Sequence, residues 1–205
     1  MHKRILSSDT DLLVGDWNTS PLQLSSVTCD RKFVGMPSYL PSVSYDVSSY
    51  PPSFDLMCAR TGKFQCVLSP VQIKKLQKVK KNPRGQMKGF PSDHVPVEFL
   101  VTKPLKPDWK MRIATWNVCN FDEADHESAK VGFERMEKDE RYSKLMEHVG
   151  TLLSRNDVLC LQEVPFDFFD DLLLPRVVQE KGYTVESKSL RDKSCKPAYH
   201  LVIIS

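Results

Sequence analysis

The sequence lacks the long apolar segments that mark membrane and secreted proteins. No apolar run approaches about 20 residues, the length that spans a bilayer, and residues 1–10 lack the apolar core of a signal peptide. The 6 cysteines show no C-x-x-C spacing, and two of them, Cys119 and Cys160, lie in or beside apolar runs where cysteine behaves as a small buried hydrophobe. We therefore expect an intracellular protein, cytoplasmic or nuclear, with reduced thiols and no membrane partner.

The sequence also lacks internal repeats and a strong net charge. Its 205 residues carry a formal charge of only +3, which does not identify a partner, and 40% of them are hydrophobic. This length buries one substantial core, as one domain or as two halves. The charge is unevenly distributed, because residues 62–92 hold eight Lys or Arg and no acid. That segment attracts a polyanion or is a solvated surface insertion, and charge alone leaves both interpretations open.

Two apolar runs near the middle of the chain organise the prediction. They span Val95–Val101 and Met111–Val118, and a short linker containing Pro and Lys separates them. If they pair as antiparallel strands, the start of the first lies beside the end of the second. Ser92, Asp93 and His94 precede the first run and Asn117 ends the second, so Asp93, His94 and Asn117 would share one rim of a sheet.

The remaining elements follow from the periodicity of apolar residues. Amphipathic spacing predicts a helix through Tyr142–Leu153 and a shorter basic one over residues 71–81, and it predicts a third over 166–179 that Pro175 divides. Residues 19–53 are rich in Ser, Pro and Tyr and are expected to be mostly loop, with Phe33 and Val34 as buried points. Strands are predicted over residues 11–14, 64–68, 157–164, 183–187 and 199–205.

Two predicted strands end in oxygen-bearing side chains, with a helix between them. Asn117 ends the first and Glu163 ends the second. Hard cations such as Mg²⁺ take carboxylate oxygens together with water and substrate phosphate, so this pattern is what a metal-dependent phosphodiesterase needs. Taken singly, Glu163 also fits an exposed acid at a strand end, and Asp16 with Asn18 fits an Asx turn that ends a strand. Asp55 lies inside an apolar run, where it needs a partner.

Together these motifs resemble the endonuclease/exonuclease/phosphatase superfamily, which includes deoxyribonuclease I, apurinic/apyrimidinic endonucleases, sphingomyelinases and inositol polyphosphate phosphatases. Finer similarity points to its deadenylase-like exonucleases, of the carbon catabolite repressor, nocturnin and Angel types, through Arg141-Tyr142 and the run D-V-L-C-L-Q-E-V over residues 157–164. The matching motifs are Thr115-Trp116-Asn117, Leu161-Gln162-Glu163, Gly15-Asp16-Trp17-Asn18, Phe54-Asp55-Leu56 and Ser92-Asp93-His94.

The order of these motifs departs from that of the family. Residues 1–102 resemble the C-terminal half of the nuclease domain, residues 103–110 are expected as a linker, and residues 111–205 resemble the N-terminal half. The family's central portion has no match. A junction of tandem domains, a circular permutant that lost its middle and an incomplete gene product each explain this order. The expected fold is α+β, a four-layer α/β/β/α sandwich that is incomplete and has its halves in permuted order.

The resemblance implies a magnesium-dependent phosphodiesterase that hydrolyses nucleic acid, as an RNA 3′-exonuclease of the deadenylase-like kind, provided that the two halves dock. Glu163 would bind Mg²⁺, with Mn²⁺ as the alternative ion, Asn117 would lie near metal and phosphate, and Asp93 would support the metal side. The expected partners are RNA, contacted by the basic run Lys74–Lys88, and further nuclease-domain segments. The alternative is a catalytically impaired fragment or tandem-domain junction that binds nucleic acid or protein.

The resemblance also assigns the residues around the phosphate. Asp16 would orient the attacking water as the base, and Asn18 would donate a hydrogen bond to the phosphoryl oxygens as charge develops. His94 would contact the same phosphate. Asp55 would hold the tautomer of that histidine and raise its basicity.

Overall fold

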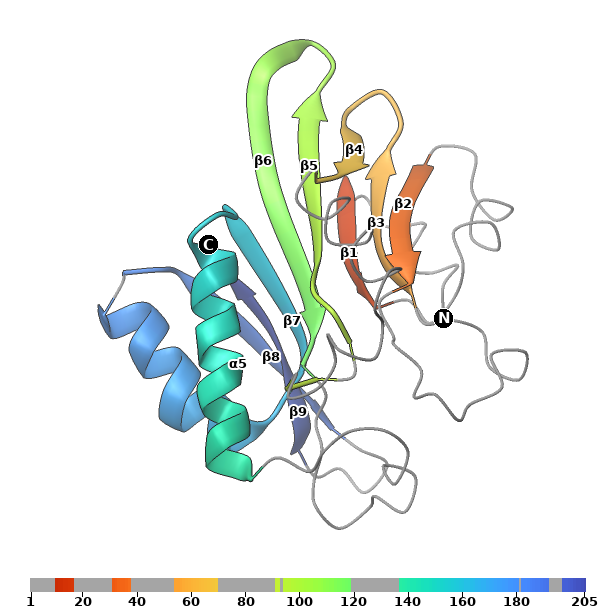
Figure 1. Cartoon of the computed structure of the whole chain (residues 1–205). Coiled ribbons are helices and arrows are strands. Elements are labelled where there is room, and N and C mark those ends of the chain that lie inside the picture. The colour runs from red at the N-terminus through yellow and green to blue at the C-terminus, as the bar shows by residue number, and fades with distance from the viewer. Residues whose placement is uncertain are drawn as a thin grey trace, which may run out of the picture.

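Two sheets and one layer of helices make up the structure (Figure 1). The computed structural model describes residues 10–16, 31–37, 54–69, 91–92, 94–118, 137–180, 182–191 and 197–205. The smaller sheet is antiparallel and has the order β1-β3-β2, formed by β1 (Leu12–Asp16), β3 (Phe54–Arg60) and β2 (Arg31–Pro37).

The larger sheet has six strands in the order β4-β5-β6-β7-β9-β8. Its one parallel pair is β6 with β7, and the other neighbours are antiparallel. A parallel pair needs a crossover connection, and helix α5 (Lys138–Leu153) lies between these strands in the sequence. The strands are β4 (Gln65–Leu68), β5 (Val97–Lys103), β6 (Lys106–Asn117), β7 (Val158–Val164), β8 (Val185–Arg191) and β9 (Pro197–Ile204).

The predicted pairing of the two central apolar runs is confirmed by the β5–β6 hairpin. The register places Val97 opposite Thr115 and Val101 opposite Met111. The connection is shorter than the expected linker over residues 103–110, because β6 begins at Lys106 and only Pro104 and Leu105 form the turn. Segments from both halves of the sequence therefore share one continuous sheet.

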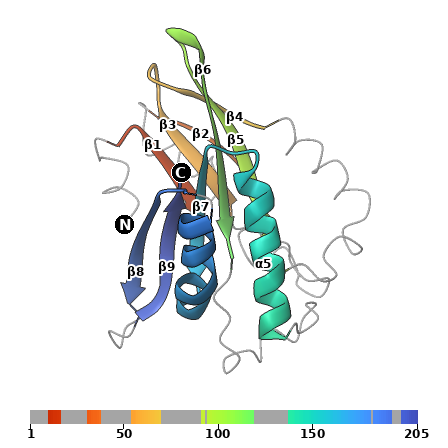
Figure 2. The ribbon, with the colours of Figure 1, turned by 90° about the vertical axis from the view of Figure 1, so that its left-hand side faces the viewer.

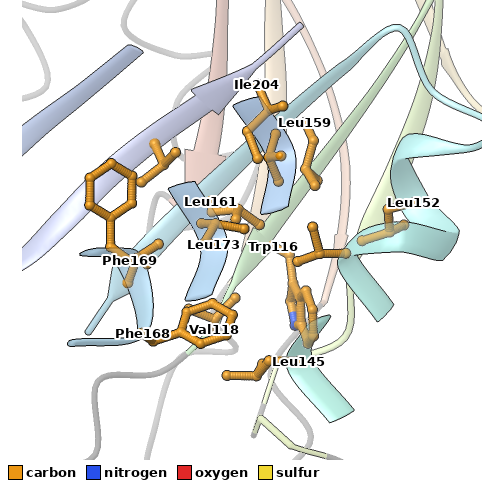
Figure 3. Close-up of a cluster of buried hydrophobic side chains, with 14 of the residues drawn as sticks. Trp116, Val118, Leu145, Leu152, Leu159, Leu161, Phe168, Phe169, Leu173 and Ile204 are labelled. Atoms are coloured by element: carbon orange, nitrogen blue, oxygen red, sulfur yellow. The ribbon is translucent and has the colours of Figure 1, made fainter. Parts of the chain in front are cut away.

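The helical layer covers one face of the larger sheet (Figure 2). It consists of α5 and two π-helical segments, η3 (Phe168–Leu173) and η4 (Pro175–Glu180). Proline has no N–H for the helical ladder, so the division expected at Pro175 is found. The core under this layer is drawn in Figure 3 and includes the fully buried Trp116, Leu145, Leu152, Leu159, Leu161, Phe168, Leu173 and Ile204.

The second core lies between the two sheets. Alternate residues of each strand point to opposite faces, so Ala114 and Trp116 of β6 face the helices whereas Ile113 packs between the sheets. Both halves of the sequence contribute buried side chains to this core, among them Met57, Ala59, Cys66, Val97, Phe99, Val101, Ile113 and Cys160.

A buried carboxylate ties the end of α5 to the larger sheet. The side chain of Glu98 on β5 is 3% exposed and accepts two hydrogen bonds of 2.7 Å from Arg155. Asn156 donates a third bond of 3.2 Å to the same carboxylate. Guanidinium and carboxylate planes match in such a bidentate pair, which fixes the geometry as well as the charge balance.

The expected α+β class is confirmed. Of the four expected layers, the described residues form three: the helices, the six-stranded sheet and the three-stranded sheet (Figure 1). Strand β2 was not predicted, and the predicted helix over residues 71–81 lies outside the described ranges. None of the helices within those ranges has the length and apolarity that crossing a membrane requires.

Candidate active site

The predicted site residues that the structure describes lie at one rim of the two sheets. Asn117 is the last residue of β6, and Glu163 is the next-to-last residue of the neighbouring β7. Because β6 and β7 are parallel, their C-terminal ends meet at this rim. Asp16 ends β1 and stands opposite Asp55, near the start of β3, at the last position of their antiparallel register.

Glu163 reaches the rim through a β-bulge. Leu161 pairs with Val202 of β9 and Val164 pairs with His200, so two residues of β7 oppose one residue of β9. Both Leu161 and Val164 belong to the core under the helices. Strict alternation would have placed Glu163 on that helical face beside Leu161, and the bulge removes it from this row.

The backbone of Glu163 is strained. Its φ is +54°, in the left-handed region, and it is the one residue other than glycine with positive φ in the described ranges. This conformation costs roughly 1–2 kcal/mol for a residue with a Cβ atom. Such a cost persists only where the surrounding structure enforces it, and it is typical of functional positions.

The carboxylate of Glu163 is held by the carboxamide of Asn117. The Nδ2 atom of Asn117 donates a hydrogen bond of 3.0 Å to Oε1 of Glu163. Asn117 is 3% exposed, so its side chain is fixed by its surroundings. A second side-chain hydrogen bond joins the same two strands beside this one: Nε2 of Gln162 donates to the Thr115 hydroxyl at 3.0 Å.

The segment that precedes β5 is tied to the end of β6 by two hydrogen bonds, and a third bond lies within the segment itself. The hydroxyl of Ser92 donates to the carbonyl oxygen of Asn117 at 2.8 Å and accepts from the backbone N–H of His94 at 3.0 Å. The indole Nε1 of Trp116 donates to the carbonyl oxygen of His94 at 2.8 Å. His94 and Asn117 thus lie together at the rim, as the sequence predicted, and His94 is only 6% exposed.

The smaller sheet meets the larger one at the same rim. A Cβ atom on Gly15 would stand 4.0 Å from Nε2 of Gln162, which places the end of β1 beside the bulge of β7. Gly15 has φ +149°, a conformation that favours glycine. It directly precedes Asp16, so the backbones of Asp16 and Asp55 belong to this rim. The predicted site residues Asn18 and Asp93 lie outside the described residues.

The donor set fits a hard divalent cation. No group of three His, Cys, Asp or Glu side chains converges within the ranges that the structure describes. Mg²⁺ does not require one, because it is commonly held by one or two carboxylates and keeps waters or substrate phosphate as its other ligands. Glu163 supplies one carboxylate, and its fixed hydrogen bond from Asn117 orients that carboxylate as second-shell groups do in metal sites.

Two ionisable groups near the site have shifted pKa values. Burial, and then the negative charge of Glu163, raise the pKa of Tyr199 at the rim end of β9. Burial raises the pKa of Cys160 to about 12, so this thiol stays protonated and unreactive, as expected for a buried cysteine. Tyr199 therefore keeps its proton at physiological pH.

Three contributors to the rim were not predicted from the sequence. They are the guanidinium of Arg141, the indole of Trp116 and the hydroxyl of Tyr199. Arg141 carried a detectable signal, because a cation in the first turn of a helix is unfavourable unless it has specific acceptors. Trp116 belonged to the motif Thr115-Trp116-Asn117 without a role of its own, and Tyr199 carried no signal, since apolar burial explains Trp and Tyr in a strand equally well.

Solved structures that are similar to this chain include the following two. The human Nocturnin catalytic domain with bound sulfate matches 100% of this chain and 74% of its own, with a TM-score of 0.49 and 11% identity. A humanized D. rerio TDP2 carrying 14 mutations matches 99% of this chain and 75% of its own, with a TM-score of 0.47 and 12% identity. Both belong to the superfamily that the sequence motifs resemble.

No protein-family model and no curated protein matches the sequence.

Proposed function

We propose that this chain is a divalent-metal-dependent phosphodiesterase that hydrolyses nucleic acid, acting on RNA from the 3′ end. The observation that carries the proposal is the hydrogen bond from Asn117 to Glu163, because a bulge and a strained backbone bring Glu163 into reach of it. A structural acid at a strand end would need neither. Strain of this kind persists where a side chain must be aimed at a reacting group.

The residues have separate roles in the proposal. Glu163 would hold Mg²⁺ or Mn²⁺, and the bound ion would neutralise the negative charge of the phosphate. Asn117 orients the carboxylate of Glu163 and lies beside the phosphate, and Asp93 supports the same side. Asn117 is 3% exposed, and exclusion of water from its side chain strengthens its hydrogen bond to Glu163.

The remaining residues act on water and on the phosphoryl group. Asp16 orients the attacking water and takes its proton as the general base. Asn18 donates a hydrogen bond to the phosphoryl oxygens as charge develops on them. His94 contacts the same phosphate, and Asp55 fixes its tautomer. Lys74–Lys88 would contact the RNA backbone, which makes binding salt-dependent.

The substrate and the direction of hydrolysis are tested with one labelled oligonucleotide. A 20-residue oligoribonucleotide labelled at its 5′ end is incubated with the chain and Mg²⁺, alongside the matching oligodeoxyribonucleotide. We expect a ladder of RNA products that shortens stepwise from the 3′ end. Asp16→Asn should slow it by about 100- to 10,000-fold, the usual contribution of a general base.

Other outcomes of this assay lead away from the proposal. Preferential cleavage of the DNA strand, or internal cuts, would contradict the RNA 3′-exonuclease assignment. Tight RNA binding without turnover would support the alternative of a nucleic-acid-binding module.

A further inference from the structure

Arg141 links two segments that flank the candidate site. It lies in the first turn of α5, and its Nε donates a hydrogen bond of 3.0 Å to the carbonyl oxygen of Pro91. Its Nη2 donates a bond of 2.7 Å to the carbonyl oxygen of Val118. Pro91 directly precedes Ser92, and Val118 directly follows Asn117, so one guanidinium holds the outer ends of both segments.

The position of the segment before β5 depends on such hydrogen bonds. The β5–β6 ladder extends to the pair Val97 and Thr115, and of the described residues just before β5 (91, 92 and 94–96) His94 alone makes a bridge. A ladder would have fixed the distance between the segments through its regular spacing. Here the bonds of Ser92, Trp116 and Arg141 do so instead.

The location of Arg141 on its helix supports a specific role. Cations are unfavourable near a helix N-terminus because of the positive end of the helix dipole. The first turn of α5 also contains Asp139 and Glu140, which suit that end. Hydrogen bonds from a charged donor to two carbonyl oxygens offset the unfavourable position of Arg141.

We propose that Arg141 is a positioning residue that sets the distance between His94 and Asn117, an inference that rests on the proposed phosphodiesterase function. The planar guanidinium reaches both carbonyl groups at once in a fixed geometry. A lysine ammonium is a single point donor on a flexible stem and does not reproduce that geometry. Loss of these two hydrogen bonds lets the segment that carries His94 move relative to the end of β6.

A first test measures positioning without any substrate. The indole N–H of Trp116 donates to the carbonyl of His94, so its hydrogen exchange reports on the contact between the two segments. The chain has 3 tryptophans, and Trp116→Phe identifies the resonance of interest. In Arg141→Lys we expect that indole hydrogen to exchange about tenfold faster, the effect of losing one charge-assisted hydrogen bond.

The matched control is Arg155→Lys. Arg155 follows the C-terminal end of α5 and holds Glu98 with a bidentate pair of hydrogen bonds, and neither residue belongs to the two segments that Arg141 joins. Any faster exchange that follows only from lower global stability will be present in both variants. A positioning role predicts faster exchange at Trp116 in Arg141→Lys alone.

A second test separates positioning from substrate contact by steady-state kinetics. Displacement of a reacting group by about 1 Å costs about 100-fold in rate, so Arg141→Lys should lower kcat by about 10- to 100-fold with KM within about twofold of the wild-type value. Arg155→Lys should retain the wild-type kcat. Direct contact of Arg141 with substrate would raise KM instead and would overturn the proposal.

The two tests fail independently. If the wild-type chain hydrolyses no nucleic acid, the proposed function is contradicted, and the exchange measurement still decides whether Arg141 positions the segment. If activity is present but Arg141→Lys matches the wild type in both exchange and kcat, the positioning role is wrong.

Discussion

The Nδ2 atom of Asn117 donates a hydrogen bond of 3.0 Å to Oε1 of Glu163 across the one parallel strand pair of the larger sheet. The regular alternation of strand β6 places the side chain of Asn117 at this position. The side chain of Glu163 reaches it only through a β-bulge and a backbone φ of +54°. The strained backbone therefore lies at the proposed metal ligand, which links local strain to function.

This strain predicts a trade-off between stability and activity at Glu163. Glycine adopts positive φ without a steric cost, so Glu163→Gly should raise the free energy of unfolding by up to about 1–2 kcal/mol while abolishing hydrolysis. Urea denaturation measures the stability, and the oligoribonucleotide assay measures the activity. Glu163→Gln is the control, because it removes the charge but keeps the strained backbone.

One result would contradict this trade-off. If Glu163→Gly is less stable than Glu163→Gln, the backbone at this position is not strained in solution.

A second prediction places a divalent cation at the Asn117–Glu163 pair. Asn117→Asp puts two carboxylates about 3 Å apart, and like charges this close destabilise the folded chain unless a cation lies between them. We expect a lower Tm than wild type in EDTA and a larger Tm increase on addition of Mg²⁺ or Mn²⁺. Ligand at 100 times its Kd stabilises a fold by about 2.7 kcal/mol.

The control for this experiment is Asn156→Asp. Asn156 also donates to a carboxylate, Glu98, at 3.2 Å, but at the far end of α5. It should lose stability in EDTA without recovery by Mg²⁺. Equal recovery of both variants would indicate unspecific binding and would contradict a metal site at Glu163.

A third prediction concerns the buried Glu98 and its half-buried partner Arg155. Removing the arginine leaves the buried carboxylate without its charged partner, so Arg155→Met should cost up to about 3–5 kcal/mol of unfolding free energy. The double variant Glu98→Met/Arg155→Met should recover most of this loss. A double variant as unstable as Arg155→Met alone would mean that the lost stability comes from side-chain packing and not from the unpaired carboxylate.

A fourth prediction follows from His200 of β9. Its ring packs against Phe166 and Phe169, and its Nε2 has no hydrogen-bond partner among the residues that the structure describes. Burial lowers its pKa, an effect that Asp170 partly opposes. Because the folded pKa lies below the unfolded value of about 6.5, the unfolded state binds more protons as pH falls. Stability is therefore lost below about pH 6.5.

His200→Leu should flatten this loss. Urea denaturation at pH 7 and pH 5 should show a smaller drop in unfolding free energy for the variant than for wild type. An equal drop in both proteins would mean that His200 titrates normally in the folded state.

The sequence predicted the parts of the fold that regular periodicity controls. The β5–β6 hairpin, α5 and β7 follow from apolar spacing alone, and the shared rim of His94 and Asn117 follows from the antiparallel pairing. Strand β2 was missed because its neighbours in the sequence are Ser, Pro and Tyr, and only Phe33 and Val34 carry a buried-strand signal.

The arrangement of the site depends on features that periodicity does not encode. A bulge adds one residue to a strand without a composition signal, so the sequence marked Glu163 as a candidate ligand but did not show that its side chain leaves the helix-facing row. The early start of β6 at Lys106 reflects pairing across the turn that tertiary contacts with Trp109 and Met111 support. The reach of Arg141 depends on a helix position that only the folded chain defines.

The central claim is that Glu163 and Asn117 form a divalent-metal site for phosphodiester hydrolysis. The most direct test is the initial rate of nucleotide release from the labelled oligoribonucleotide in Mg²⁺, compared between wild type and Glu163→Gln. The account predicts release by wild type that EDTA stops, and no detectable release by Glu163→Gln although it remains folded. Release by Glu163→Gln at the wild-type rate, or release that persists in EDTA, would contradict it.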